Sequence, residues 1–172
     1  RYLRSAQLEK DFYDFRALEN YIVTPAMAAA LLRITDGLHD GSSRRAWRVT
    51  GDYGVGKSSF ALVLAHLLAH SVGDDTARIA DSIGWTEEQS SRLPMWPILI
   101  TGSREGIVDA IARGIRENLE FKRGASKPAE WKAIDKALDV CQKSPTARSL
   151  EHLLGALREK GSEDGRGIVL IV

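Results

Sequence analysis

Hydrophobic residues in this chain fall either into short continuous runs or into stripes with helical spacing. Continuous runs at residues 96–101 and 168–172, which follow proline or glycine, predict strands buried on both faces of a parallel sheet. A third run at residues 46–50, which contains Trp47 and Val49, predicts another strand. Long segments separate the three runs, so crossover connections must join the predicted strands.

Stripes with a spacing of three or four residues fill the intervals and predict helices. The first helix opens at Thr24 and Pro25, a capping hydroxyl followed by a proline in the first turn, and Gly37 lies near its end. The polar residues 71–94 predict one or two short surface helices, with a capping box at residues 86–89. Further helices are predicted at residues 57–70, 103–121, 129–143 and 146–160.

Strands that alternate with helices predict an α/β fold, with a parallel sheet and right-handed crossovers. We therefore expect a three-layer α/β/α sandwich. In such sheets ligands bind at the carboxyl ends of the strands. The glycine-rich segment that directly follows residue 50 is therefore the first candidate for a ligand site.

Composition narrows the class of protein. With 172 residues, of which 44% are hydrophobic and 27% charged, the chain is long enough for one compact core. Neither a bilayer-spanning run nor a signal-peptide core is present in the sequence, so we expect a cytoplasmic protein without a membrane partner. A formal net charge of +1 neither requires nor excludes nucleic acid, and Cys141, on an apolar helical stripe, is predicted to be a core residue.

The most informative motif is the octapeptide GDYGVGKS at residues 51–58, which matches the Walker A pattern G-x-x-x-x-G-K-[ST] of phosphate-binding loops (P-loops). It lies between a predicted strand and a predicted helix, which is the context that such a loop requires. Gly51, Gly54 and Gly56 leave backbone N–H groups open to the phosphates of a nucleoside triphosphate, without Cβ atoms in the way. The helix that follows adds unpaired N–H groups and the positive end of its dipole.

The side chains of the motif have distinct predicted roles. Lys57, the predicted catalytic residue, reaches the β- and γ-phosphate oxygens, and the hydroxyl oxygen of Ser58 is the predicted ligand of Mg²⁺. The other predicted nucleotide-binding residues are Asp52, Tyr53 and Val55, which offer mainly backbone N–H groups, and Ser59, which packs or caps. The motif thus predicts a site for ATP or ADP with Mg²⁺.

The two ends of the chain predict that it belongs to a longer protein. It starts at Arg1 and stops in the apolar run 168–172, where many P-loop ATPases continue into an acidic Walker B residue and a catalytic glutamate. We therefore expect a lead-in segment at residues 1–24 and a partial P-loop domain at residues 25–172, truncated at the Walker B strand. The acids would follow Val172, and the fragment alone would hydrolyse ATP very weakly or not at all.

The sequence WRVTGDYGVGKSSF at residues 47–60, with YIVTP at residues 21–25, resembles P-loop ATPases of the AAA+ and STAND type, the origin-recognition-like branch in particular. A weaker likeness is to large ATPases of bacterial anti-phage and DNA-processing systems. The resemblance implies that the segment with Tyr21 and Val23 lines the adenine pocket. It also implies ATP hydrolysis that remodels a protein or nucleic-acid partner, with an arginine finger from a later domain or from a neighbouring subunit of a homo-oligomer.

Two other functions stay open from the residues alone. A small-molecule kinase would use the same loop, and Arg113, Arg116 and Arg123 would then serve its substrate or lid, although their helical spacing favours a solvated face. Kinases also usually carry the loop close to the N-terminus. A non-hydrolysing nucleotide switch or scaffold in a signalling or defence protein is the other alternative. An Asp-Glu pair directly after Val172 would favour hydrolysis, and a pair without acids would favour the switch.

Overall fold

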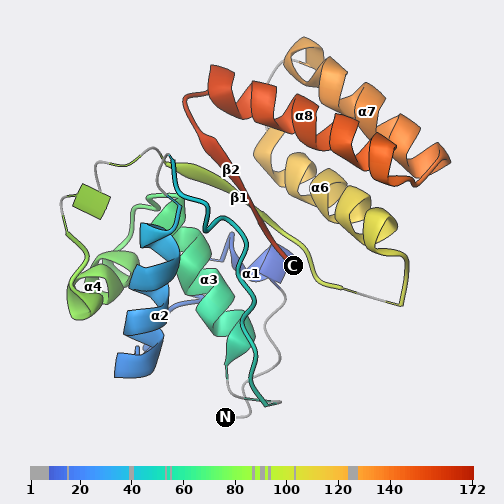
Figure 1. Ribbon diagram of the computed structural model, residues 1–172. Helices are drawn as coiled ribbons and strands as arrows, with labels where there is room; N and C mark the ends of the chain where they lie inside the picture. Colours follow the sequence, from blue (N-terminus) through green and yellow to red (C-terminus); the bar gives the residue numbers. More distant parts are fainter. Residues whose placement is uncertain are drawn as a thin grey trace. The chain divides into compact units, whose positions relative to one another are not determined.

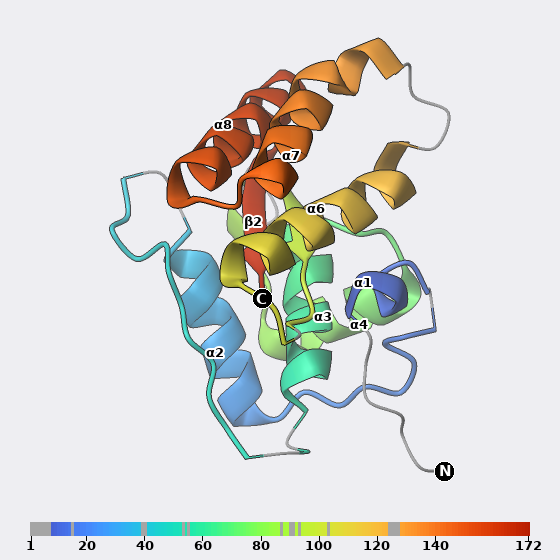
Figure 2. The same ribbon diagram turned by 90° about the vertical axis from the view of Figure 1, so that its right-hand side faces the viewer.

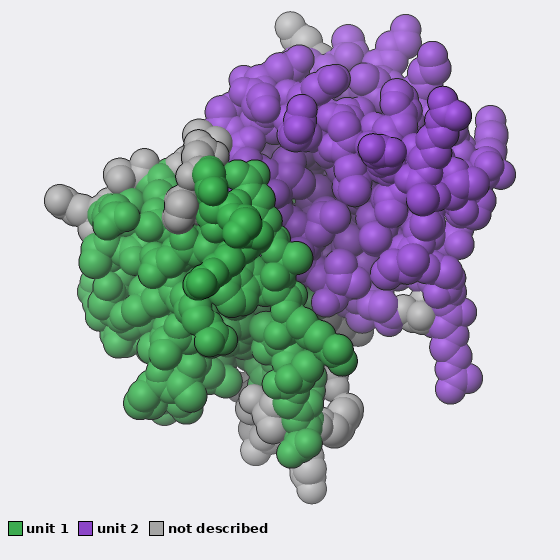
Figure 3. Space-filling model, viewed as in Figure 1, with its two compact units in different colours: residues 1–94 green, residues 95–172 purple. Residues whose placement is uncertain are grey.

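A computed structural model of the chain describes residues 8–14, 16–38, 41–52, 54, 56–86, 88–89, 92, 94–102, 104–123 and 128–172. The chain divides into two compact units, residues 1–94 and residues 95–172, which have different colours in Figure 3. We call them unit 1 and unit 2 and describe each by itself. The predicted boundary between a lead-in at residues 1–24 and a P-loop domain at residues 25–172 stays a prediction.

Unit 1 is built around helix α3 (Lys57–Leu68), which confirms the helix predicted after the glycine-rich loop. This helix contacts α1 (Leu8–Asp11), α2 (Pro25–Asp36) and α4 (Asp74–Ile83) (Figure 1). Contacts on several sides suit a helix that is apolar nearly all round. The buried residues of α3 are Phe60, Leu62, Val63, Leu64, Ala65, Leu67 and Leu68.

Helix α2 begins where the sequence predicts. The Thr24 hydroxyl oxygen accepts a hydrogen bond from the N–H of Met27 at 3.3 Å, and Pro25 occupies the first turn, where a missing N–H costs nothing. At the other end, Gly37 donates its N–H to the carbonyl oxygens of Arg33 and Ile34. The Gly37 position leaves no room for a side chain, because an added Cβ would lie 2.7 Å from a ring carbon of Trp47.

The polar segment that follows α3 also has the predicted character. Helix α4 ends at Gly84, whose φ of 72° lies in the left-handed region that favours glycine. After it, Thr86 donates its N–H to Oε1 of Gln89 at 2.8 Å, and Gln89 donates its N–H to the Thr86 hydroxyl oxygen at 3.4 Å. These reciprocal bonds confirm the predicted capping box. Glu87, inside it, lies outside the described residues.

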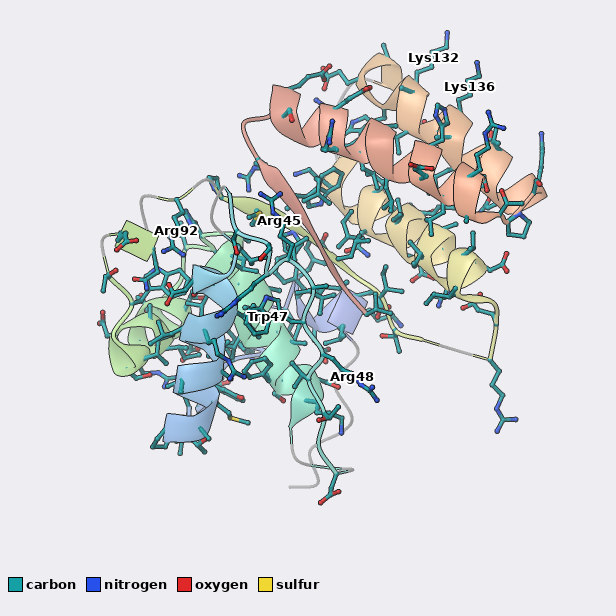
Figure 4. All side chains as sticks on the ribbon, viewed as in Figure 1. Arg45, Trp47, Arg48, Arg92, Lys132 and Lys136 are labelled. Carbon is teal, nitrogen blue, oxygen red and sulfur yellow. The ribbon has the colours of Figure 1, made fainter. Side chains whose placement is uncertain are left out.

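The prediction of a strand at residues 46–50, in unit 1, is wrong. These residues have no regular secondary structure, Val49 is 49% exposed, and Trp47 alone among them is half-buried. Trp47 packs against Gly37 of α2 and donates its indole N–H to the Arg44 carbonyl oxygen at 3.1 Å (Figure 4). A strand forms only beside another strand, and the described part of unit 1 contains none. Residues 46–50 therefore have no neighbouring strand in the described part of unit 1 with which to form backbone hydrogen bonds.

Unit 2 contains the two other predicted strands. Strand β1 (Met95–Leu99) pairs in parallel with β2 (Gly167–Ile171), with Trp96 opposite Ile168 and Ile98 opposite Leu170. In Figures 1 and 2, two helices lie on the strand pair and a third packs on both of them. These are α6 (Ile107–Arg123) against β1, α8 (Ala147–Glu163) against β2, and α7 (Lys132–Lys143), which is preceded by the short 3₁₀ helix η1 (Pro128–Trp131).

The core of unit 2 lies between the strands and these helices. Trp96 and Trp131 meet edge to face with ring centroids 5.7 Å apart, a favourable geometry for two buried aromatic rings. Cys141 is fully buried in the same cluster, which confirms its predicted core position. On the opposite face of α7, Lys132 and Lys136 point into solvent (Figure 4). The cluster consists of Trp96, Ile98, Ile100, Ile111, Ala112, Ile115, Leu119, Trp131, Ile134, Ala137, Leu138, Cys141, Leu153 and Leu157.

One edge of β1 is closed by side chains. Ile100, just after β1, donates its N–H to the Ile171 carbonyl oxygen of β2 at 2.8 Å, so Leu99 directs its N–H and C=O to the opposite edge. There the Asn118 side chain accepts from the Leu99 N–H at 3.2 Å and donates to the Leu99 carbonyl oxygen at 2.7 Å. Pro97 has no N–H to offer at this edge. Any further strand of the sheet therefore belongs beside β2.

The fold is thus a mixture of helices and strands in which the described strands form one parallel pair. The predicted helices at residues 103–121, 129–143 and 146–160 are confirmed with shifts of a few residues at their ends. This arrangement does not by itself establish the expected three-layer sandwich, which stays a prediction.

Candidate functional site

The glycine-rich motif enters α3 at its N-terminus. Gly56 is the N-cap, and its carbonyl oxygen accepts the first helical hydrogen bond, from the N–H of Phe60 at 2.9 Å. The N–H groups of Lys57, Ser58 and Ser59 come before any helical acceptor, so they have no partner within the helix. Gly56 has no side chain to cap them, and none of these N–H groups donates a hydrogen bond to another described residue, so they and the positive end of the helix dipole are available to an anion.

Two of the three motif glycines adopt a backbone conformation that other residues rarely take. Gly54 has a φ of 84° and Gly56 a φ of 87°, both in the left-handed region. A Cβ at either position would strain the turn, so the motif needs glycine there. Gly51 has a different role, because it contributes a carbonyl oxygen to the lysine of the motif.

The amine of Lys57 is held against the loop. Its Nζ donates to the carbonyl oxygen of Gly51 at 2.9 Å and to that of Asp52 at 2.7 Å. Both acceptors are neutral and belong to the first two residues of the motif. Lys57 is exposed, so its charge faces solvent and is not neutralised by a carboxylate in these contacts. The loop thus presents a cation together with free N–H groups.

The other predicted site residues fall into three groups. Asp52 is exposed, and Ser58 and Ser59 are half-buried in the first turn of α3, beside Lys57. Ser58 is therefore on the same turn as the N–H groups that would bind phosphate, as a ligand of phosphate-bound Mg²⁺ must be. Tyr53 and Val55 lie outside the described residues.

Tyr21, predicted to line the base pocket, is connected to the loop through one methionine. The Tyr21 hydroxyl donates to the Met27 sulfur at 3.4 Å, and a Cβ built on Gly56 would lie 3.7 Å from the terminal methyl carbon of Met27. The phenol and the last glycine of the motif thus both lie at the tip of the Met27 side chain, beside its bonded Sδ and Cε atoms. Burial raises the pKa of Tyr21 above 10.0, so the phenol stays neutral. Val23 is half-buried in the same segment.

Sequence reasoning missed two residues of this region. Met27 reads as one more apolar position of α2, and nothing in its spacing reveals the contact with Tyr21. Arg78 reads as part of a solvated helix face, because Asp75 precedes it at i,i+3 spacing. Its guanidinium also reaches the carbonyl oxygens of Tyr21 and Leu18, at 3.0 Å and 3.4 Å. A partner 57 residues away in the chain leaves no local signal.

The arginines of the kinase alternative are engaged within unit 2. Arg113 donates to the carboxylates of Glu105 and Glu117, and its pKa is raised, first by its hydrogen bond to Glu105. Arg116 donates to Asp139 and Gln142 at 3.2 Å and 2.6 Å. The side chain of Arg123 lies outside the described residues. The pairs of Arg113 lie on α6 and the segment before it, and those of Arg116 join α6 to α7, which agrees with the predicted solvated helix face.

Within the described ranges, no helix combines the length and the apolar character needed to cross a bilayer. The same residues gather no group of three or more His, Cys, Asp or Glu side chains that would hold a metal ion by themselves. Mg²⁺ bound with a nucleotide does not need such a group, since phosphates and water supply most of its oxygens. Comparisons with protein-family models, with curated proteins and with solved structures found no match.

Proposed function

We propose that this chain binds ATP or ADP with Mg²⁺ at the loop before α3, and that the full-length protein hydrolyses ATP to remodel a protein or nucleic-acid partner. The observation that carries the proposal is the start of α3, where Lys57 is held over a loop with two left-handed glycines. A polyphosphate needs a cation and free N–H groups at one point. Helix packing alone requires neither.

Charge supports the phosphate assignment. The contacts of Lys57 with two neutral carbonyl oxygens place its amine at the loop while leaving it uncompensated. Bonds between an ammonium group and phosphate oxygens are shorter and roughly twice as strong as neutral hydrogen bonds. A bound triphosphate would therefore draw the amine from these carbonyls onto its β- and γ-oxygens. Ser58 would ligate Mg²⁺, which neutralises further phosphate charge.

The proposed architecture is the three-layer α/β/α sandwich of P-loop proteins. The parallel pairing of β1 with β2, with helices between the strands in sequence, supports it. Because Asn118 and Pro97 close the outer edge of β1, the proposed sheet continues beyond β2. The remodelling activity and the homo-oligomer rest on the resemblance to AAA+ and STAND ATPases. The engaged Arg113 and Arg116 weigh against the kinase.

Calorimetric titration with Mg-ATP and Mg-ADP tests the proposal. Lys57→Ala should weaken binding about 10- to 100-fold, the equivalent of losing one or two charge-assisted hydrogen bonds. Lys136→Ala, which removes an exposed lysine of α7, is the matched control and should bind as the unaltered chain does. Equal affinities for the Lys57→Ala variant and the unaltered chain would show that the loop is not the site. ATP turnover by the chain should stay close to that of Lys57→Ala, and steady turnover well above it would contradict the expectation that this chain by itself hydrolyses ATP very weakly or not at all.

A further inference from the structure

The segment that leads into α2 is tied to α4 by one guanidinium group. Arg78 donates from Nη1 to the Tyr21 carbonyl oxygen at 3.0 Å and from Nη2 to the Leu18 carbonyl oxygen at 3.4 Å. Leu18 is buried, and the N–H of Tyr21 donates back to its carbonyl oxygen at 3.0 Å. Arg78 therefore binds both ends of one turn.

The turn between these residues needs such support. Asn20, inside it, has a φ of 59°, a left-handed conformation that asparagine tolerates better than most residues but that still costs energy. The neighbouring Ile22 is 81% exposed, so packing on that side does not fix the backbone. The hydrogen bonds from Arg78 to the carbonyl oxygens of Leu18 and Tyr21 therefore hold the backbone of this turn in place.

The guanidinium is itself oriented by its own helix. Nε and Nη2 of Arg78 both donate to Oδ1 of Asp75, at 3.3 Å and 2.9 Å. This contact leaves Nη1 directed at Tyr21 and fixes the fork geometry that a lysine amine cannot reproduce. The side chains of Arg78 and Asp75 are 47% and 32% exposed, so the ion pair is screened and adds little to overall stability. The effect of the ion pair is to fix the position of the Arg78 guanidinium group.

From Tyr21 the connection continues to the loop. The phenol contacts the Met27 sulfur, and the Met27 methyl group lies beside Gly56. We propose that Arg78 is a positioning residue for the nucleobase: it holds Tyr21 in place, so that the base of a nucleotide whose phosphates occupy the loop meets a preformed wall of Tyr21 and Met27. This inference rests on the proposed nucleotide site.

The inference separates two parts of the ligand. Phosphate contacts would come from the start of α3 and from Lys57, with which Arg78 makes no hydrogen bond among the described residues. Loss of Arg78 should therefore weaken ligands that carry a base and spare ligands that consist of phosphate alone. A role of Arg78 in stability alone would weaken both kinds of ligand alike.

Titration calorimetry with Mg-ATP and with magnesium tripolyphosphate separates these cases. Arg78→Gln should raise the Kd for ATP about 5- to 20-fold, less than Lys57→Ala does because Arg78 acts on the base through Tyr21, and should leave the Kd for tripolyphosphate within about twofold. Arg78→Lys should restore part of the ATP affinity, because an amine reaches one carbonyl oxygen. Arg44→Gln, an exposed arginine of the same unit, is the control and should change neither value.

The outcomes distinguish this inference from the proposed function. If Lys57→Ala binds both ligands as the unaltered chain does, or the unaltered chain binds neither, the nucleotide site itself is wrong and the inference falls with it. If Lys57→Ala loses both ligands but Arg78→Gln keeps the original ratio of the two Kd values, the site stands and Arg78 does not position the base.

Discussion

Replacement of Asn118 by leucine should destabilise unit 2, because the Asn118 amide completes the edge of β1. The side chain is 1% exposed and makes three hydrogen bonds, two with the Leu99 backbone and one with the Gly114 carbonyl oxygen. Leucine has nearly the same volume, so the substitution removes the polar contacts and creates almost no cavity. The effect then measures the hydrogen bonds.

The cost follows from what leucine leaves behind. Leu99 is fully buried, so its N–H and its carbonyl oxygen would both lose their partner without gaining water. Each buried unsatisfied group costs about 1–3 kcal/mol. The Gly114 carbonyl oxygen keeps its helical bond and adds little. Since leucine recovers about 1 kcal/mol through its apolar surface, we expect a net loss of about 1–5 kcal/mol in the free energy of unfolding of unit 2.

Urea unfolding followed by tryptophan fluorescence measures this loss. Trp96 and Trp131 are both buried in unit 2 and report on it, provided that Trp47 and Trp85 are replaced by phenylalanine in every variant. Glu120→Ala, on the exposed side of the same helix, is the control and should change the midpoint little. A free energy for Asn118→Leu within about 0.5 kcal/mol of the reference, the range of neutral surface changes, would refute the closed edge at Leu99.

Two further predictions test other contacts. Gly114→Ala should destabilise unit 2 by about 1–3 kcal/mol, because the added Cβ would lie 2.7 Å from Cγ1 of Ile100. Gly155→Ala, whose added Cβ would meet nothing within 4 Å, should instead stabilise α8 by about 0.5–1 kcal/mol. If the urea midpoints of the two variants shift in the same direction, the close approach of Gly114 to Ile100 is contradicted. Burial lowers the pKa of His66, which stacks on Phe12, below 6.5, so the unfolded chain binds a proton that the folded chain resists. The contribution of His66 to the stability of unit 1 should be full above pH 6.5 and fall below it. His66→Leu should therefore reduce the difference between the melting temperatures measured at pH 7.5 and pH 5.5. An equal difference in the variant and the unaltered chain would contradict this role of His66.

Local chemistry made much of the structure predictable. The Thr24–Pro25 start of α2 follows from one hydroxyl and one fixed φ, and both act within a single turn. The strands of unit 2 follow from continuous apolar runs, which have no stable place outside a covered sheet. The motif glycines at positions 54 and 56 adopt the left-handed backbone that explains why the pattern requires them. Each of these features depends on neighbours in the sequence.

Features that depend on partners far away in the chain could not be predicted from the sequence. In the sequence Asn118 looks like any polar residue of α6. In the structure its amide binds the N–H and carbonyl oxygen of Leu99, as the backbone of a neighbouring strand would. Arg78 looks paired with Asp75, and its contact with Tyr21 spans 57 positions. In both cases the decisive partner is a backbone group. Every residue carries such a group, so a sequence pattern cannot single out the one that is used.

The wrong strand at residues 46–50 and the closed edge of β1 constrain the proposed sandwich together. An extended apolar segment gains its stability as a strand from a neighbouring strand, and the described part of unit 1 offers none. In unit 2 the outer edge of β1 is blocked by Pro97 and Asn118, while β2 carries apolar residues that are only partly buried. A further strand of the sheet in unit 2 would therefore have to pair with β2. The hydrogen bonds of Asn118 all lie within unit 2, so Asn118→Leu should alter the stability of unit 2 without changing the ratio of ATP to tripolyphosphate affinity at the proposed site in unit 1.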